Sequence, residues 1–412
     1  MTSHGGLMMK SRQEIKLSKS MDKPTGEQGI GLYIHVPFCV SKCVYCDFLS
    51  FEGMGACTHE LYVHALIEEM RSVNADITNE HCITNIDTVY IGGGTPTALS
   101  SSLLCVILQE VQQFSLSSDV EITLEMNPVT NPLAVLADYT RHGVNRLSIG
   151  LQAWQDEFLR GLRRAHTSAE FTQTMRAAHA AGIDNINVDL MFGLPWQSLW
   201  HWSESIAQVV AHSPTHISTY SLTPAENTPL WDALEARQIA LPSESTDRDM
   251  YYEAVKMLTA AGYEHYELSN FALPGLESRH NVDCWLRKPY LGLGLGAHSF
   301  DGVRRWCNTS DMGLYLDVWG TEGKNGRDFA RVDMKALSQR DAMAETMFLG
   351  LRMTKGVNLQ TFYQRFDQHL YDCYGQELEM LTAKGLIACT TERVALTPLG
   401  MDLANQVFEA FL

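Results

Sequence analysis

The sequence predicts an α/β fold built on a parallel sheet, which is curved into a full or partial barrel or doubly wound. Three observations support this class. Between residues 30 and 222, six short, apolar, β-branched runs alternate with segments of helical spacing. The 412 residues exceed one ordinary hydrophobic core, so a large domain with a smaller companion is expected. Hydrophobic residues make up 45% of the chain and charged residues 19%, which is the balance of a folded globular protein.

The predicted elements follow one another in a regular order. The strands cover residues 32–36, 88–91, 121–125, 146–149, 185–191 and 216–222. The helices cover residues 61–73, 103–114, 133–142, 169–181, 199–210 and 247–261. A loop at 223–228 follows the sixth strand, and an aromatic, glycine-punctuated region spans 263–300.

The two ends of the chain differ from this pattern. The first 28 residues carry five basic and three acidic side chains without apolar periodicity, which predicts a disordered leader over 1–29 and argues against a transit peptide. From about residue 335 the pattern is helical again, with a two-stranded wing at 385–396, so a small, mainly α domain of winged-helix shape is expected. The predicted parts are 1–29, 30–230, 231–334 and 335–412.

Charge and cysteine content limit the function. The net charge of −17 argues against general binding to nucleic acid, and residues 335–412, with seven basic and nine acidic side chains, are a poor DNA-binding surface. The chain has ten cysteines but neither a signal peptide nor a long apolar span. A reducing, cytoplasmic location is therefore expected, and some of the thiols should have a chemical role.

Three of those cysteines lie directly after the first predicted strand, within eight residues. They are Cys39, Cys43 and Cys46. A four-iron cluster normally has four thiolate ligands, so three on one short loop would hold three irons and leave the fourth open to a ligand. The alternative is structural zinc with His35 or Asp47 as a further ligand, but the second Cys or His pair of ordinary zinc modules is missing. The spacing favours the iron–sulfur cluster.

The CxxxCxxC spacing, with an aromatic residue before the last cysteine and YIHVPFC in front, resembles the radical S-adenosylmethionine superfamily. The flanking block is similar to the branch that contains oxygen-independent coproporphyrinogen oxidases (HemN) and haem chaperones (HemW). The resemblance implies a partial barrel of six βα units around a [4Fe-4S] cluster, S-adenosylmethionine as cofactor, and a HemN-type C-terminal domain.

Polar or glycine-rich endings follow all six predicted strands, where the chemistry of a βα barrel is located. Acidic groups there suit a cationic sulfonium ligand with an amino group and hydroxyls. The resemblance assigns these positions to binding of S-adenosylmethionine: Tyr33, Tyr45, Gly93, Gly94, Thr95, Glu125, Gln152, Arg164, Asp189 and Thr223.

Three features distinguish the two members of the branch. The oxidase pattern has a fourth cysteine where this chain has Phe48, and it has an N-terminal extension over the active site. The segment 279–285 matches the HNxxYW haem-binding motif of the chaperones, with Cys284 in place of tyrosine between His280 and Trp285. A neutral imidazole can ligate haem iron, and an indole offers an apolar face to a porphyrin. The alternative is that His280 caps a turn and Trp285 is a core residue.

The leading hypothesis is a haem chaperone that carries haem, or another porphyrin, to respiratory haem proteins, with a homodimer as an associated expectation. The alternative is a coproporphyrinogen III oxidase, for whose substrate carboxylates only Arg164, Arg304 and Arg305 offer basic partners. Catalytic residues are not assigned. A third hypothesis is a zinc-structured interaction protein without cofactor chemistry.

Overall fold

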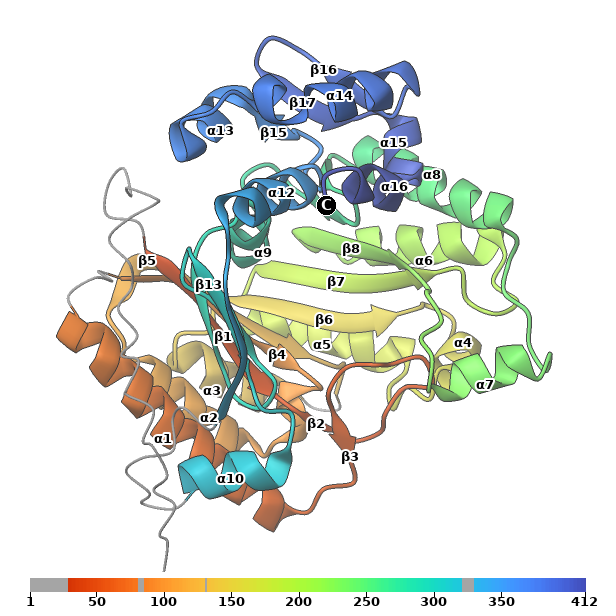
Figure 1. Cartoon of the computed structure of the whole chain (residues 1–412). Helices are drawn as coiled ribbons and strands as arrows, with labels where there is room; N and C mark the ends of the chain where they lie inside the picture. Colours follow the sequence, from red (N-terminus) through yellow and green to blue (C-terminus); the bar gives the residue numbers. More distant parts are fainter. Residues whose placement is uncertain (1–28, 81–84, 130–131, 321–329) are drawn as a thin grey trace, which may run out of the picture.

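A partial barrel of six parallel strands forms the centre of the molecule (Figure 1). The computed structural model describes residues 29–80, 85–129, 132–320 and 330–412, so the predicted leader lies outside the described residues except for Gly29. The strands lie side by side in chain order: β1 (Ile30–Val36), β4 (Ile86–Gly93), β5 (Leu116–Met126), β6 (Arg146–Gln152), β7 (Asn185–Phe192) and β8 (His216–Ser221). Each coincides with a predicted strand to within a few residues.

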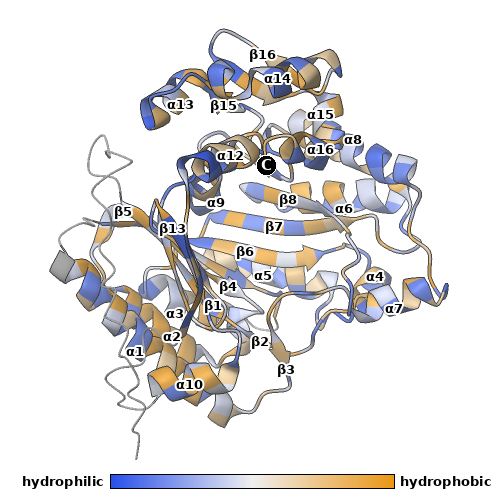
Figure 2. Ribbon diagram, viewed as in Figure 1, coloured by the Kyte–Doolittle hydropathy of each residue, from blue (hydrophilic) through white to orange (hydrophobic). Residues whose placement is uncertain are grey.

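The alternation of side chains explains why these strands form one layer of a barrel. On β5, Ile122 and Leu124 are buried in the main apolar core, whereas Glu125 faces the interior cavity. Figure 2 shows the same alternation of apolar and polar residues along β6 and β7. Because side chains on a strand point to opposite faces in turn, the apolar set packs against helices and the polar set lines the interior.

Helices connect successive strands, as the sequence predicted. Six of them match the predicted helices: α1 (Ala56–Glu80), α2 (Ser101–Val111), α3 (Leu133–Arg141), α5 (Ser168–Ala180), α6 (Leu199–Ala211) and α8 (Glu244–Ala260). The shorter helices η1 (Pro96–Ala98), α4 (Asp156–Gly161) and α7 (Pro229–Glu235) were not predicted. Their few residues carry too little periodicity to be recognised in the sequence.

The sheet continues beyond the six strands on both sides. On one side β11 (Tyr290–Leu293) pairs parallel with β1, and β12 (His298–Phe300), β13 (Arg304–Asn308) and β14 (Arg331–Ala336) follow antiparallel. On the other side β10 (Asn270–Ala272) and β9 (Glu264–Glu267) extend it. Within the described residues no pairing joins β14 to β9, so the barrel is open. The predicted aromatic, glycine-punctuated region thus contains four strands and the short helix α9 (Arg279–Trp285).

The C-terminal segment has its own apolar core. The core residues, which run from Met343 to Phe411, come from three longer helices, α12 (Gln339–Gly350), α13 (Leu359–Phe366) and α14 (Leu370–Ala383), two short ones, α15 (Pro398–Asp402) and α16 (Ala404–Glu409), and a small sheet. The predicted wing at 385–396 is the hairpin β16 (Ile387–Cys389) and β17 (Arg393–Leu396), which β15 (Val357–Asn358) joins. The mainly helical C-terminal part is therefore confirmed.

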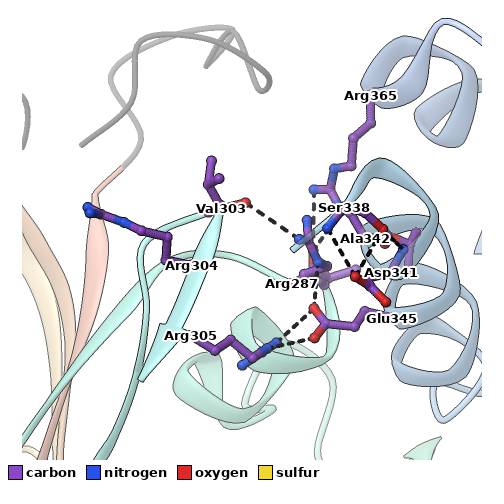
Figure 3. Close-up of polar contacts among 12 residues, drawn as sticks. Arg287, Val303, Arg304, Arg305, Ser338, Asp341, Ala342, Glu345 and Arg365 are labelled. Atoms are coloured by element: carbon purple, nitrogen blue, oxygen red, sulfur yellow. Dashed lines mark hydrogen bonds and ion pairs between the residues drawn. The ribbon is translucent and has the colours of Figure 1, made fainter. Parts of the chain in front are cut away.

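Two arginines and one glutamate join this segment to the sheet extension (Figure 3). Arg287 donates through Nε to Glu345 Oε2 at 2.8 Å, and Arg305 donates through Nε to Oε1 at 2.7 Å and through Nη2 to Oε2 at 3.0 Å. Both guanidinium groups also lie over the Phe300 ring, at 4.6 and 4.4 Å from its centroid. Since the side chain of Arg287 is only 2% exposed, Glu345 neutralises a charge that water does not reach.

We expect Glu345→Ala to lower the free energy of unfolding by about 3 kcal/mol, because it leaves buried guanidinium charge unpaired. The control is Glu253→Ala, which removes a surface pair with the exposed Lys256 and should cost under about 0.5 kcal/mol. Urea unfolding monitored by fluorescence measures both variants. Equal losses would show that the cluster at Glu345 contributes no more than an ordinary surface pair.

Candidate functional site

The cysteine loop is attached to the mouth of the barrel by backbone and apolar contacts. It leaves β1 through β2 (Phe38–Cys39), which pairs with β3 (Phe51–Glu52) beyond the loop. Val44 donates its N–H to Leu162 O at 3.3 Å and accepts from Leu230 N at 2.9 Å. Val44 and Tyr45 pack against the apolar cluster formed around α4 and α7. These contacts fix the segment that carries the three thiols.

The loop and the strand ends enclose a cavity of about 350 Å³. This volume is at the lower end of the range for small-molecule sites. Most of the residues predicted to bind the cluster or S-adenosylmethionine line it together: Cys39, Cys43, Tyr45, Cys46, Gly93, Gly94, Thr95, Glu125, Gln152, Arg164 and Asp189. The parallel strands bring these positions together although they are spread over 150 residues.

Two predicted residues are not part of this lining. Tyr33 lies behind it, where its hydroxyl donates to His35 Nδ1 at 2.9 Å and its ring stacks on Tyr90 at 6.3 Å. Thr223 is exposed beyond the end of β8. The cavity also includes residues that were not predicted as site residues, among them Ser41, Tyr90, Asn127, Ser148, Arg163, Met191 and Tyr220. Tyr90 and Ser148 could have been found from the strand alternation, since both share the inward face with selected residues.

Glu125 is the central acidic group of the cavity. Its carboxylate accepts from the Tyr90 hydroxyl at 2.8 Å and from Gly93 N–H at 3.2 Å. Burial, together with the charge of Asp189, raises the pKa of Glu125 to about 7. Burial also raises the pKa of Asp189, against hydrogen bonds from Asn187 and Ser148. Two carboxyl groups that ionise reluctantly in isolation are well suited to a cationic ligand, which would stabilise their charged form.

The glycines after β4 make room for neighbouring protein atoms. Gly93 has a φ of +118°, and a Cβ there would lie 2.6 Å from the His35 ring. A Cβ on Gly94 would lie 2.6 Å from the carbonyl oxygen of Phe38. The resemblance assigns Gly93 and Gly94 to binding of S-adenosylmethionine; in the structure their missing side chains also allow β4 to lie directly against the start of the cysteine loop.

The site fits an iron–sulfur cluster better than a single metal ion. Within the described residues, no group of three His, Cys, Asp or Glu side chains is arranged to hold one ion. His35 has both ring nitrogens engaged, with Tyr33 and with Leu49 O, and Asp47 is exposed outside the cavity. In a cluster each thiolate binds a different iron, so its sulfurs need not converge on one point. The three cavity thiols are free, as this requires.

The haem-motif residues share helix α9, but His280 points into the protein. His280 is 6% exposed. Its Nδ1 forms a hydrogen bond of 2.9 Å with Thr88 Oγ1, and its ring stacks on the Tyr90 ring with 5.3 Å between the centroids. Burial, with a contribution from Arg146, lowers the pKa of His280 to about 4, so the imidazole is neutral near pH 7. Among the described residues nothing bonds to its Nε2.

Of the other two motif residues, Trp285 faces the C-terminal segment and Cys284 is buried. The guanidinium of Arg352 lies 4.4 Å over the Trp285 ring, and the buried indole Nε1 has no hydrogen-bond partner among the described residues. Burial raises the pKa of the Cys284 thiol to about 12, so it is protonated. The three residues are therefore on one element without forming a common open surface.

Comparison with known proteins identifies two matching families. Residues 33–209 match the Radical SAM superfamily, and residues 337–403 match the HemN C-terminal domain. The chain is 35% identical over 382 residues to the heme chaperone HemW of Bacillus subtilis (strain 168), which covers 92% of this chain and 98% of that protein. It is 32% identical over 401 residues to the radical S-adenosyl methionine domain-containing protein 1, mitochondrial, of Mus musculus, covering 92% and 88%.

The fold is that of a solved radical SAM enzyme. Coproporphyrinogen III oxidase (HemN) from Escherichia coli matches with a TM-score of 0.80 at 23% identity, over 93% of this chain and 90% of that chain. The match confirms the predicted fold class, with its partial barrel and C-terminal domain. In the part of the chain that the structure describes, no helix is both long enough and apolar enough to span a membrane.

The pKa of Glu125 generates a test of the cavity. Above pH 7 the wild-type protein holds an ionised buried carboxylate, while in the unfolded chain this group ionises near its ordinary value of 4.5. Its contribution to stability is therefore present below pH 4.5 and is lost as the pH rises through 7. Glu125→Gln, which stays neutral, should stabilise the cofactor-free protein by on the order of 2–3 kcal/mol at pH 8.5 and little at pH 5. Urea midpoints at the two pH values measure this, and a difference that does not change with pH would contradict it.

Proposed function

The chain belongs to the family of the heme chaperone HemW within the radical SAM superfamily, and on this basis we propose that it binds haem and passes it to haem proteins of respiration. The observation that carries the proposal is the relation to HemW over 98% of that protein's length, which includes the segment of the haem motif. We further propose that the chain binds a [4Fe-4S] cluster and S-adenosylmethionine, and that these ligands regulate transfer or the formation of a homodimer.

The cavity supports the cofactor part of the proposal. Cys39, Cys43 and Cys46 would each hold one iron, and the open iron would face the ligand. Glu125 and Asp189 would accept from its amino group and hydroxyls. When bound, the reduced cluster supplies the electron that can cleave a sulfonium. The protein contributes a partly open cavity in which its carboxylates are already positioned by Tyr90, Ser148 and Asn187.

The haem part of the proposal assigns the axial ligand to His280. Its imidazole is neutral, which is the state that iron ligation requires, and no described residue bonds to its Nε2. In the described conformation the ring is covered by β4, so haem binding requires α9 to move away from Thr88 and Tyr90. Trp285 and Cys284 would then be placed beside the porphyrin. The contacts of α9 and the residues after it with Glu345 and Arg352 would be broken or rearranged in the same step.

The alternative, coproporphyrinogen oxidation, has weaker support in the structure. Arg305 is paired with Glu345 and Arg304 with Asp301, and neither lines the cavity. They are therefore unsuited to hold substrate carboxylates next to the cysteine loop. Arg164 remains in the cavity, but it is already bonded to Asn127 and Gly150. Phe48 stands in place of the fourth cysteine of the oxidase pattern, and this difference also argues against the oxidase.

Haem titration tests the leading function. We expect wild-type protein to bind haem with a Soret shift, and His280→Ala to bind at least tenfold more weakly because the axial nitrogen is lost. The matched control is His298→Ala, which removes an exposed imidazole on β12 and should leave the titration unchanged. Wild-type protein that binds no haem, or equal losses in the two variants, would overturn the proposal.

Anaerobic reconstitution tests the cofactors and the alternative on one preparation. We expect about four irons and four sulfides per chain, a strong reduction of both in Cys43→Ser, and no conversion of coproporphyrinogen. Zinc in place of iron would establish the metal-structured alternative, and formation of protoporphyrinogen would establish the oxidase.

A further inference from the structure

A hydrogen-bond chain connects two of the cluster cysteines through Asn127, a residue that lines the cavity just after β5. Its Nδ2 donates to Thr95 Oγ1 at 3.3 Å, and its Oδ1 accepts from Arg164 Nη2. The reverse orientation of the amide would direct its NH2 group at the guanidinium, which has only donors. The partners therefore fix which end of the amide faces which neighbour.

Each end of this series of hydrogen bonds contacts a cysteine sulfur. Thr95 Oγ1 lies 3.8 Å from Cys39 Sγ, and because it accepts from Asn127, its own hydrogen is available to the thiolate. Arg164 Nη1 donates to Cys43 Sγ at 3.4 Å. The guanidinium is held in place by Asn127 and by Gly150 O, to which Nη2 donates at 2.5 Å.

We propose that Asn127 is a positioning residue, which holds Thr95 and Arg164 as donors to the sulfurs of Cys39 and Cys43 and thereby raises the reduction potential of the bound cluster. The inference rests on the proposed [4Fe-4S] site. Reduction adds one negative charge to a cluster, and part of that charge is carried by the sulfurs. Donors directed at the sulfurs stabilise the reduced state more than the oxidised one, so their loss lowers the potential.

The contact to Cys39 through Thr95 (the Thr95 arm) and the contact to Cys43 through Arg164 (the Arg164 arm) can be separated by substitution. Asn127→Leu removes both contacts at similar volume. Asn127→Asp keeps an acceptor for Arg164 but loses the donor to Thr95, whose hydroxyl then turns to the carboxylate and away from Cys39. Thr95→Val removes only the arm to Cys39, and Thr95→Ser keeps it.

The experiment is an anaerobic redox titration of the reconstituted cluster, followed by electron paramagnetic resonance without S-adenosylmethionine. We expect a shift to more negative potential in Asn127→Leu, a smaller shift in Thr95→Val, and the wild-type value in Thr95→Ser. Thr95→Val should add nothing further in an Asn127→Asp background, because both changes remove the same donor. The control is Ser41→Ala, since this cavity hydroxyl donates to Arg163 O and not to a sulfur.

The outcomes distinguish this inference from the proposed function. If wild-type protein binds no cluster, both fail. If the cluster is bound and its potential is the same in Asn127→Leu, or in Thr95→Val where Asn127→Leu does not assemble a cluster, the inference fails and the proposed function stands. A shift in Ser41→Ala as large as in Thr95→Val would also overturn it.

Discussion

The parallel pairing of six strands in chain order is the constraint on which the rest of the structure depends. Parallel strands all end at one edge of the sheet, so residues far apart in the sequence meet there. The strand register also places residues of neighbouring strands side by side: Tyr33 is paired with Tyr90, and Glu125 with Ser148. Several polar side chains on the inner face bond to one another, as Glu125 does to Tyr90 and Asp189 to Ser148 and Asn187, while the outer face supplies the apolar burial. The barrel interior is therefore polar while the apolar core lies between sheet and helices.

Those features that the sequence could predict depend on local patterns. The six strands were recognisable because each carries regularly spaced apolar, often β-branched residues that pack under the helices, and the cysteine spacing is a local motif on a loop. The short strands β9 to β14 escaped recognition because each contains three to six residues, and pairing between distant segments stabilises them. Thr223 was assigned by the resemblance, but its side chain is exposed beyond the end of β8 and does not line the cavity.

The orientation of His280 shows a different limit. The motif identifies the residue, but its environment comes from Thr88 and Tyr90, some 190 residues earlier in the chain. No local pattern contains that contact. Asn127 is a similar case, since its sequence context shows only that it follows a strand. The contacts of its amide exist because the ends of β4 and β5 are neighbours and because Arg164, which follows α4, lies against Gly150 of β6.

Tyr90 contacts both the haem-motif residue His280 and the cavity residue Glu125. Its ring lies against His280, and its hydroxyl donates to Glu125 in the cavity at the barrel mouth. A cationic ligand that keeps Glu125 ionised strengthens this hydrogen bond, because a charged acceptor binds a hydroxyl more tightly than a neutral one. A stronger bond to Glu125 holds Tyr90 in the position where its ring covers His280. The proposed movement of α9 on haem binding would break the contact between Tyr90 and His280. If the ionisation of Glu125 affects this contact, the two ligands are coupled, and by reciprocity each then alters the affinity for the other.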